Sequence, residues 1–381
     1  MTSYFALQIK VIVATAAFVV ATTILLRRKA GCRGRPWRLW LGTLVAGLAA
    51  GVFAIGMAGP ILGTVYTTFG VIAFLYWAFA WFVPLAMIVE CGRRGLRTPS
   101  GCLALGFAAL AIGVAAWALF VEPNRLQTRT ERLEVAGFAS GPPLRIVHVS
   151  DLQTIGPESR TEDAIARVNA LDADLIVFTG DYMAGPFHDP EPPLQDARHF
   201  FEQIRARFGT VVVPGHSDPD RLRRRLFEGM TKVFALDNSE CVFDLPDGRR
   251  IRVWGLPPHD ADFEAIVGPT DPRELFIVAG HVPGQTRDLT GRGVHLHLAG
   301  HTHGGQIVIP GFGAPITLDE LPRKYARGFF RYEDHALNVT AGIGMEGGMA
   351  PRVRLFCPPE VCLIEIHGTE SAAANDPERL R

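Results

Sequence analysis

Two histidines lie two positions apart in the segment 300–306, which reads GHTHGGQ. The run before it, 294–298, alternates aliphatic residues with histidine and predicts a half-buried strand. On a chain that stays extended past this strand, His301 and His303 project to the same side. Two imidazoles on one side, followed by glycines that let a ligand approach the backbone, suit a divalent metal ion. Because such a pair is a weak signal alone, a metal site requires further ligands elsewhere in the chain.

Acids and histidines also follow four other apolar runs. The runs 144–149, 175–179, 210–213 and 275–279 are typical of buried strands, and soon after their ends stand Asp151, Asp181, His216, Asp218 and His281. Taken singly, each of these side chains is more often a helix cap or a turn residue. In open α/β sheets the carboxyl ends of the strands line the ligand crevice, so five such ends together predict one shared site.

The set of motifs and its order resemble the calcineurin-like metallophosphoesterases, specifically a membrane-associated bacterial group that carries GHTHGGQ. The family motifs run D-x-H, G-D, G-N-H-[DE], G-H or S-H, and G-H-T-H. Their counterparts in this chain are 151–153, 180–181, 215–218, 280–281 and 300–303. The resemblance covers about residues 143–366 and implies a two-sheet β-sandwich flanked by helices, an α/β fold.

The resemblance also implies two divalent metal ions that hydrolyse a phosphoester by activating water. One ion would be held by Asp151, Gln153, Asp181 and His303. The other would be held by Asp181, His216, His281 and His301, with Asp181 shared. The identity of the ions stays open among Mn, Fe, Zn, Mg and Ca. Two such ions stabilise the attacking and the leaving oxygens of an in-line displacement at phosphorus.

Three positions depart from the family pattern. Gln153 stands where the family has a metal-binding His, and His216 stands where it has a metal-binding Asn. The exchange is reciprocal, so we expect both metals to persist, with more oxygen ligands and a preference for Mn²⁺, Mg²⁺ or Ca²⁺ at the first. Ser217 replaces the His thought to protonate the leaving group. We therefore predict catalytic roles for Asp181, His216 and Asp218, with Asp218 or His188 as a substitute acid.

Two alternatives remain open at this point. In a different alignment the Asn is lost and His216 is the retained acid, although the G-x-x-D spacing of 215–218 favours the first alignment. In the other alternative, Gln153 and Ser217 mark a catalytically impaired membrane protein that binds metal or phosphoester as a sensor.

Arginines near the motifs have two interpretations. Arg352 and Arg354 alternate toward one face and could meet a substrate phosphate, but surface salt bridges are an equal explanation. The basic run 221–225 is typical of a solvated helix face, and contact with anionic headgroups is the less common alternative.

Composition divides the chain near residue 121. Residues 1–121 contain ten Lys and Arg and a single acid, Glu90, whereas the remainder contains 28 basic and 37 acidic residues. The front also contains four apolar segments, near 4–26, 39–58, 71–90 and 102–121. A helix of about 20 apolar residues spans the hydrocarbon layer, so we predict a four-helix all-α transmembrane anchor over 1–121.

The loops of this anchor predict its orientation. Arg and Lys crowd the connections 27–38 and 93–97, whereas the N-terminal tip and the connection 59–70 have none. The positive-inside rule then places the catalytic domain on the outer, periplasmic or extracellular, side. Transport is disfavoured because the segments lack ionisable groups deep inside them. We expect the lipid bilayer and a phosphoester, possibly lipid-linked, as partners, and no nucleic acid because the second part is acidic.

We expect three further stretches after the anchor. Residues 122–142 should form a linker and entry strand, 143–367 the phosphoesterase-like domain, and 368–381 a disordered tail. Besides the strands already named, apolar runs predict strands at 251–254, 294–298, 337–340 and 361–366. Amphipathic patterns predict helices at 161–171 and 194–208.

Overall fold

The chain divides into two compact units. The computed structural model describes Phe74 and residues 76–85, 87–88, 99–185, 189–346 and 352–369. The first unit comprises Met1–Val121 and Glu346–Val353, and the second comprises Glu122–Met345 and Arg354–Arg381.

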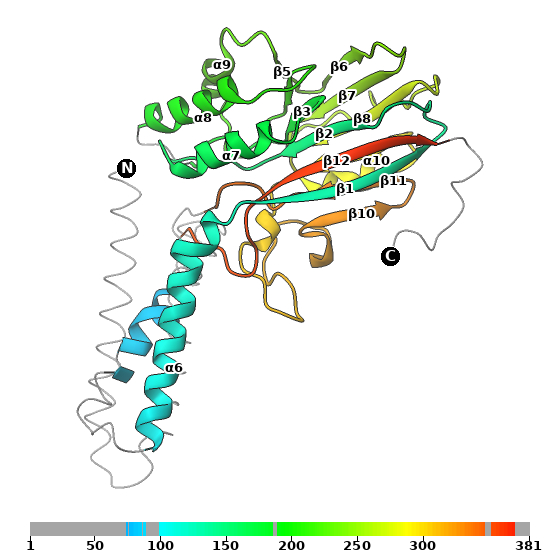
Figure 1. Ribbon diagram of the computed structural model, residues 1–381. Helices are drawn as coiled ribbons and strands as arrows, with labels where there is room; N and C mark the ends of the chain where they lie inside the picture. The colour runs from blue at the N-terminus through cyan, green and yellow to red at the C-terminus, as the bar shows by residue number, and fades with distance from the viewer. Residues whose placement is uncertain are drawn as a thin grey trace. The chain divides into compact units, whose positions relative to one another are not determined.

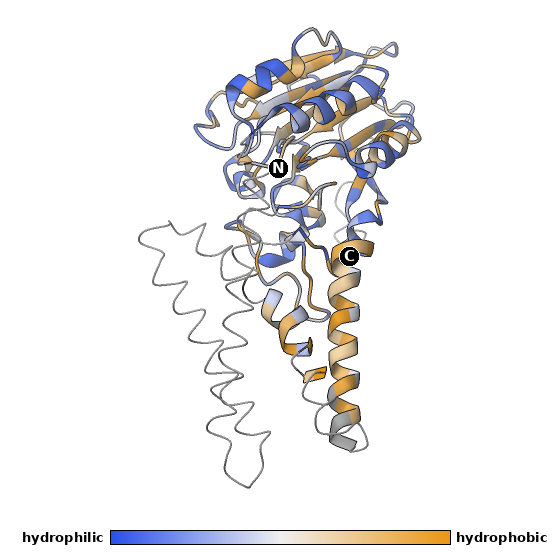
Figure 2. Cartoon of the chain, turned by 90° about the vertical axis from the view of Figure 1, so that its left-hand side faces the viewer, coloured by the Kyte–Doolittle hydropathy of each residue, from blue (hydrophilic) through white to orange (hydrophobic). Residues whose placement is uncertain are grey.

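The described part of the first unit is helical and apolar. Helix α6, Pro99–Ala116, runs without acidic or basic residues in its first and last turns and continues into η2, Trp117–Val121. Its residues are coloured hydrophobic almost throughout in Figure 2. In the described residues one helical stretch, Leu105–Asn124, is long and apolar enough to cross a membrane. Because signal sequences and soluble cores contain such helices too, this stretch alone does not establish a span.

The four-helix anchor therefore stays a prediction. Its first two segments, near 4–26 and 39–58, lie outside the described residues. The third is described only in part, including η1, Ala78–Phe82.

The second unit is built on two six-stranded sheets, shown in Figure 1. The order in the first sheet is β1 (Gln127–Ala136), β12 (Glu360–Thr369), β2 (Leu144–Val149), β3 (Leu175–Phe178), β4 (Thr210–Val212) and β5 (Val233–Ala235). The order in the second is β10 (Gly328–Tyr332), β11 (His335–Val339), β9 (Leu296–Ala299), β8 (Glu274–Gly280), β7 (Arg250–Leu256) and β6 (Ser239–Asp244).

Parallel pairing brings the ends of the central strands to one edge of each sheet. In the first sheet, β3 pairs in parallel with β2 on one side and β4 on the other. In the second sheet, the adjacent strands β7, β8, β9 and β11 pair in parallel with one another. The carboxyl ends of these strands are thus available to a common site.

Aliphatic side chains from both sheets form the central core. Ile146, Leu175 and Val211 of the first sheet belong to one cluster with Ile251, Ile277 and Leu296 of the second. These strands read as nearly continuous apolar runs because their outer faces are covered as well.

Helices cover the outer face of the first sheet. α7 (Ser159–Asn169), α8 (Glu191–Gln203) and α9 (Asp220–Phe227) contribute Ala164, Phe200 and Leu226 to a second cluster with Ile176 and Phe178. In Figure 1 these helices lie together on one side of β2 and β3. The second sheet is covered by a smaller cluster that includes Phe276 of β8 and Leu289 of α10 (Thr286–Leu289).

The expected two-sheet α/β architecture is confirmed, with differences at its margins. The expected helix 194–208 is wrong at its C-terminal end, because α8 stops at Gln203, Ile204 is extended and Ala206 bridges Ala173. Strands β5, β6 and β10 had no sequence prediction. All three are edge strands whose residues are mostly half-exposed, so they lack a long apolar run.

Candidate metal centre

The strand ends converge as the motifs predict. Asp151 follows β2, Asp181 follows β3 and His216 follows β4, while His281 and His301 follow β8 and β9. Because each set of strands is parallel, these five side chains reach the same end of the sandwich from the two sheets.

Five of the predicted ligands sit in a left-handed backbone conformation. Asp151, Gln153, Asp181, His301 and His303 have φ between 45° and 67°. This region is uncommon for residues other than glycine, and such residues gather where function requires a fixed side-chain direction. The chain thus turns sharply after each strand and directs the side chain back toward the site.

Glycine is required where two of these turns approach each other. A Cβ at Gly300 would overlap Ser150 Oγ and the Asp151 carboxylate. A Cβ at Gly215 would overlap Asp181. The glycines of the motifs therefore permit the close packing that brings the ligands together.

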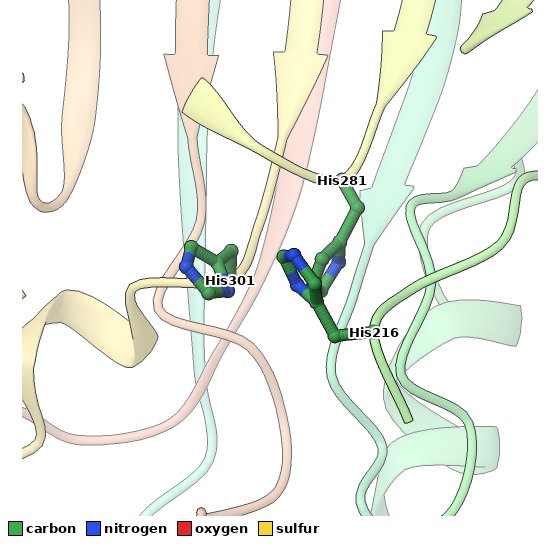
Figure 3. Close-up of side chains that lie close together, drawn as sticks. All are labelled: His216, His281 and His301. Atoms are coloured by element: carbon green, nitrogen blue, oxygen red, sulfur yellow. The ribbon is translucent and has the colours of Figure 1, made fainter. Parts of the chain in front are cut away.

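Three imidazoles form the first part of the site, shown in Figure 3. The ring centroids of His216, His281 and His301 lie 4.7–5.2 Å apart. One ligand atom from each lies within 4.8 Å of the others. These three side chains come from loops after β4, β8 and β9, so both sheets contribute.

Carbonyl acceptors fix the orientation of two of these rings. His281 Nδ1 donates to Thr179 O at 2.7 Å, and His301 Nε2 donates to Leu318 O at 3.0 Å. In the neutral, metal-binding form, each ring then carries its proton on the outer nitrogen and keeps a lone pair on the other. Metal-bound histidines are held in the same way.

Two carboxylates form the second part. Asp151 and Asp181 share a potential ligand group with His281, again within 4.8 Å. His303 Nε2 lies 3.4 Å from Asp151 Oδ1, and His281 Nε2 lies 3.5 Å from Asp181 Oδ2. Since His281 belongs to both groups of ligands, the two parts of the site are contiguous.

Asp181 is held on both of its oxygens. Ser217 N donates to Oδ1 at 2.9 Å, and Gln153 Nε2 donates to Oδ2 at 2.8 Å. The carboxylate is buried, with 4% of the residue exposed. Because a carboxylate has two oxygens, Asp181 is chemically suited to be a ligand shared by two ions.

The donor set fits divalent metal ions. Asp151 Oδ1, His281 Nε2 and His303 Nδ1 are buried without a hydrogen-bond partner in the described part of the chain. Buried polar atoms are nearly always satisfied, so several polar atoms without a hydrogen-bond partner in one place fit a site for a bound ion. Carboxylate oxygens and imidazole nitrogens are the ligands that Mn²⁺, Fe²⁺ and Zn²⁺ take in proteins.

Burial and mutual charge displace the pKa values of these groups in opposite directions. Burial, assisted by the Asp181 charge, raises the pKa of Asp151 to about 7. Burial disfavours ionised Asp181 too, but the adjacent His281 outweighs it and holds the pKa of Asp181 well below its usual range. Burial lowers the pKa of His281, yet the Asp181 charge dominates and raises it to about 10. Without metal, His281 is therefore the counter-ion of Asp181.

The remaining imidazoles are neutral at physiological pH. Burial, followed by the His281 charge, lowers the pKa of His216 to about 4. Burial also lowers the pKa of His301 and places that of His303 well below its usual value. Neutral imidazole is the form that binds metal, so these three are ready to do so.

The comparisons agree with this geometry. The family described as calcineurin-like phosphoesterase matches residues 144–305, from the start of β2 to the last glycine of GHTHGGQ. These residues form a calcineurin-like phosphoesterase domain. This match, together with a phosphodiesterase and a pyrophosphatase among the relatives, supports a metal-dependent phosphoester hydrolase.

Bacterial relatives align over much of the chain. The uncharacterized metallophosphoesterase YkuE of Bacillus subtilis (strain 168) is 27% identical over 289 residues, covering 73% of this chain and 98% of YkuE. The phosphodiesterase YaeI of Escherichia coli (strain K12) is 28% identical over 236 residues, covering 59% and 82%. The UDP-2,3-diacylglucosamine pyrophosphatase LpxG of Chlamydia muridarum (strain MoPn / Nigg) is 26% identical over 307 residues, covering 65% and 91%.

Within the phosphoesterase domain, the contacts of Asp218 do not favour the predicted catalytic role. Its carboxylate accepts hydrogen bonds from the backbone N–H groups of Asp181, Tyr182 and Gly215 at 2.7–2.9 Å. These bonds tie the loop after β3 to the loop after β4, so Asp218 positions Asp181. The other proposed substitute acid, His188, lies outside the described residues.

The predicted substrate contact of Arg354 is also disfavoured by its surroundings. The residue is fully buried, and its guanidinium donates to the carbonyls of Ala341, Gly342, Gly344, His303 and Cys357. Through these hydrogen bonds, the Arg354 guanidinium holds together the loops behind His303. Arg352 belongs to the first unit, and its contact with substrate stays a prediction.

His259 is a site residue that sequence reasoning left almost unweighted. Its exposed ring lies 5.0 Å from the His216 ring. It follows β7, which ends at Leu256 and pairs in parallel with β8. The other candidate ligands were predicted because they follow the ends of apolar runs. The same reasoning, applied to the residues after the run 251–254, would have included His259.

Proposed function

We propose that this chain is a membrane-anchored phosphoesterase that hydrolyses lipid or lipid-linked phosphoesters with two divalent metal ions. The observation that carries the proposal is the cluster of His216, His281 and His301 next to the Asp151–Asp181 pair. A mixed set of nitrogen and oxygen donors that includes two carboxylates suits a two-ion phosphoesterase.

The ligands divide into two sets around Asp181. The first set would be Asp151, Gln153, Asp181 and His303; the second would be Asp181, His216, His281 and His301. Bound ions would supply positive charge for the phosphoryl oxygens and would lower the pKa of water. The chain's part is to hold the carboxylates fixed and to keep the lone pairs of His281 and His301 directed inward, through the Thr179 and Leu318 carbonyls.

A membrane-linked substrate is favoured by two observations. The apolar helix over Leu105–Asn124 could anchor the chain in a bilayer, and the positive-inside rule would then place the domain on the outer side. Among the relatives, LpxG is a pyrophosphatase of a diacylated glucosamine nucleotide, and YaeI is a phosphodiesterase. An enzyme tethered at the bilayer would meet acylated phosphoesters at high local concentration.

The second candidate is a membrane sensor that binds metal or phosphoester without turnover. It is favoured by Gln153 and Ser217, which replace a metal ligand and the leaving-group acid of the family motifs. The two candidates differ in one measurable property, which is turnover by the metal-loaded chain.

The test uses the full chain, purified in detergent and loaded with Mn²⁺. Metal content is measured by mass spectrometry, and hydrolysis is measured with a chromogenic aryl phosphodiester and with a phospholipid in mixed micelles. We expect bound metal and turnover in the parent chain, and loss of both in His301→Ala. The matched control is His199→Ala on α8, where an exposed His pairs with Glu162 away from the site. Metal binding without turnover would support the sensor, and absence of both would refute both candidates.

A further inference from the structure

An apolar loop follows the GHTHGGQ segment. We define the apolar loop as residues 307–318. Its large exposed hydrophobic side chains are Ile309, Phe312, Ile316 and Leu318, which are 41–52% exposed. These side chains stand out because a soluble surface normally carries such residues singly.

The concentration of exposed apolar side chains in this loop is unusual for the domain. The large exposed hydrophobic residues among the described part of the second unit are Val242, Val267, Ile309, Phe312, Ile316, Leu318 and Phe356. Four of the seven belong to the apolar loop, and Phe356 follows Leu355, which bridges Ile307. Exposed apolar side chains gathered in one loop are typical of an interaction surface.

Backbone hydrogen bonds hold the apolar loop in shape. At its base, Val308 N donates to Leu355 O at 2.9 Å. At its tip, Ile309 N donates to Gly313 O at 3.0 Å and Phe312 N donates to Ile309 O at 2.9 Å. A Cβ at Gly311 or Gly313 would meet no atom within 4 Å beyond its chain neighbours, so these two positions at the tip face open space.

Two cations flank the apolar side chains. Arg323 and Lys324 are exposed, and the Arg323 guanidinium carbon lies 3.9 Å from the centroid of the Phe312 ring. Neither cation has an acidic partner among the described residues. The two neighbouring acids are engaged elsewhere: Asp319 accepts from Gly284 N and Leu321 N, and Glu320 pairs with Arg287.

The apolar loop also touches the metal centre. The Leu318 carbonyl is the acceptor that orients His301. Ala314 packs where Gly305 leaves no room for a side chain. A surface that binds the apolar loop would therefore lie immediately beside the metal ligands.

We propose that the apolar loop, together with Arg323 and Lys324, is an interfacial contact that inserts into an anionic lipid bilayer and presents the metal centre to lipid phosphoesters. Apolar side chains enter the boundary between headgroups and acyl chains, while adjacent Arg and Lys bind anionic headgroups. The cations favour a lipid surface over a second copy of this chain, whose corresponding face would carry the same charges. The insertion stands by itself, and only the choice of substrate rests on the proposed function.

A fluorescent probe tests insertion directly and without turnover. An environment-sensitive NBD group is attached at Phe312→Cys in the full chain, with the other cysteines replaced by Ser, and the protein is reconstituted into phosphatidylcholine vesicles with or without phosphatidylglycerol. We expect a blue-shifted emission that doxyl-labelled lipid quenches, more strongly with phosphatidylglycerol. The matched control is the same probe at Val242→Cys on β6, exposed to a similar extent.

The outcomes separate the possible occupants of the surface. A probe at 312 that is as water-exposed as the probe at 242 would overturn the proposal. A blue shift without quenching by lipid would indicate a protein contact, such as a second copy, and would overturn it too.

Turnover supplies the second measurement and covers the case in which the labelled chain does not fold. The variant Ile309→Ser/Phe312→Ser should lower the ratio of phospholipid to soluble aryl phosphodiester turnover by roughly tenfold, because two apolar anchors are lost. Val242→Ser/Val267→Ser is the control, and its ratio should equal that of the parent. An unchanged ratio in the loop variant would contradict the interfacial role, whereas absence of all turnover with intact quenching would contradict the proposed function alone.

Discussion

At the scale of single residues, the site is defined by how its ligands are held. Gln153 reaches Asp181 through its amide nitrogen, in a position where the family motif has imidazole. Its other terminal atom is a neutral oxygen, which is a harder donor than a ring nitrogen. This substitution should therefore be visible in the choice of metal rather than in the fold.

Replacing Gln153 by His should change metal selectivity. We expect Gln153→His to raise the content of Fe or Zn relative to Mn at the first set of ligands, because imidazole prefers those ions to Mg and Ca. Mass spectrometry of protein loaded from an equimolar metal mixture measures the ratio. An unchanged ratio, together with unchanged thermal stability, would show that Gln153 is not a ligand.

Metal affinity should rise with pH. In the metal-free protein, Asp151 with a pKa of about 7 and His281 with a pKa of about 10 both carry a proton at pH 6. A cation must displace both protons below pH 7 and one proton between pH 7 and 10. Metal affinity therefore rises steeply with pH up to about 7 and less steeply from there toward 10. Calorimetric titration with Mn²⁺ in buffers of different ionisation enthalpy, at pH 6, 7 and 8, gives the number of protons released. Affinity that falls over this range would contradict the assignment of these two ligands.

Ser217 should limit the enzyme with poor leaving groups. A positioned general acid contributes about 10²–10⁴-fold, and most of this is needed when the leaving group is an alkoxide. We expect Ser217→His to raise alkyl ester turnover relative to aryl ester turnover, measured as the ratio of kcat/KM values. Equal aryl and alkyl rates in the parent chain would mean that another group already donates the proton.

At the scale of elements, a buried polar chain connects the two sheets behind the site. Arg129 of β1 donates to Asn338 of β11, and Asn338 in turn bonds His148 of β2 at 2.6 Å. His148 then contacts Thr179 Oγ1, next to the carbonyl that orients His281. Burial lowers the pKa of His148 to about 3, so this ring is a neutral link.

Removing the centre of this chain should weaken both the fold and the metal site. Asn338→Ala removes the partner of His148 Nδ1, which costs about 1–3 kcal/mol for a group left unsatisfied in the interior, whereas Arg129 keeps Val339 O and Glu360. Chemical denaturation measures the loss, and Mn²⁺ titration should show weaker binding because Thr179 is less constrained. Gln203→Ala, at the exposed end of α8, serves as the control and should change neither property.

The elements also show what a sequence can and cannot predict here. The central strands were predictable because both of their faces are buried and their apolar runs are unbroken, as in β3 and β8. Edge strands such as β5 and β10 were not, since half-exposed residues give no such run. The candidate metal ligands could be named from their place after apolar runs together with the family motifs. The role of Asp218 did not, because its partners are backbone amides that leave no trace in the sequence.

At the scale of the whole molecule, metal binding should be coupled to stability. Candidate ligands from both sheets meet at the site, so ions bound there would link β2 and β3 to β8 and β9. A ligand that binds only the folded state stabilises it by about 2.7 kcal/mol at a hundredfold excess over its Kd. For a domain of this size, that corresponds to roughly 5–10 °C in Tm.

Chelation should lower the melting temperature of the purified chain, and Mn²⁺ should restore it. Differential scanning calorimetry or intrinsic fluorescence follows the transition, with metal added back in steps. His301→Ala should melt at nearly the same temperature with and without chelator. A parent chain that is indifferent to chelator would indicate that no ion is held at the meeting point of the sheets.

Leu318 sits at a junction between the apolar loop and the metal ligands. It adopts a left-handed conformation with φ 55°, its side chain is 52% exposed, and its carbonyl accepts the proton of His301. Leu318 thus contributes its side chain to the apolar loop and its carbonyl to the orientation of a candidate metal ligand. If the apolar loop binds lipid as proposed, binding would restrict the motion of the Leu318 peptide group and so hold the His301 ring more firmly in its orientation. The protein would then be more active when its apolar loop is bound to a bilayer than when it is in bulk water.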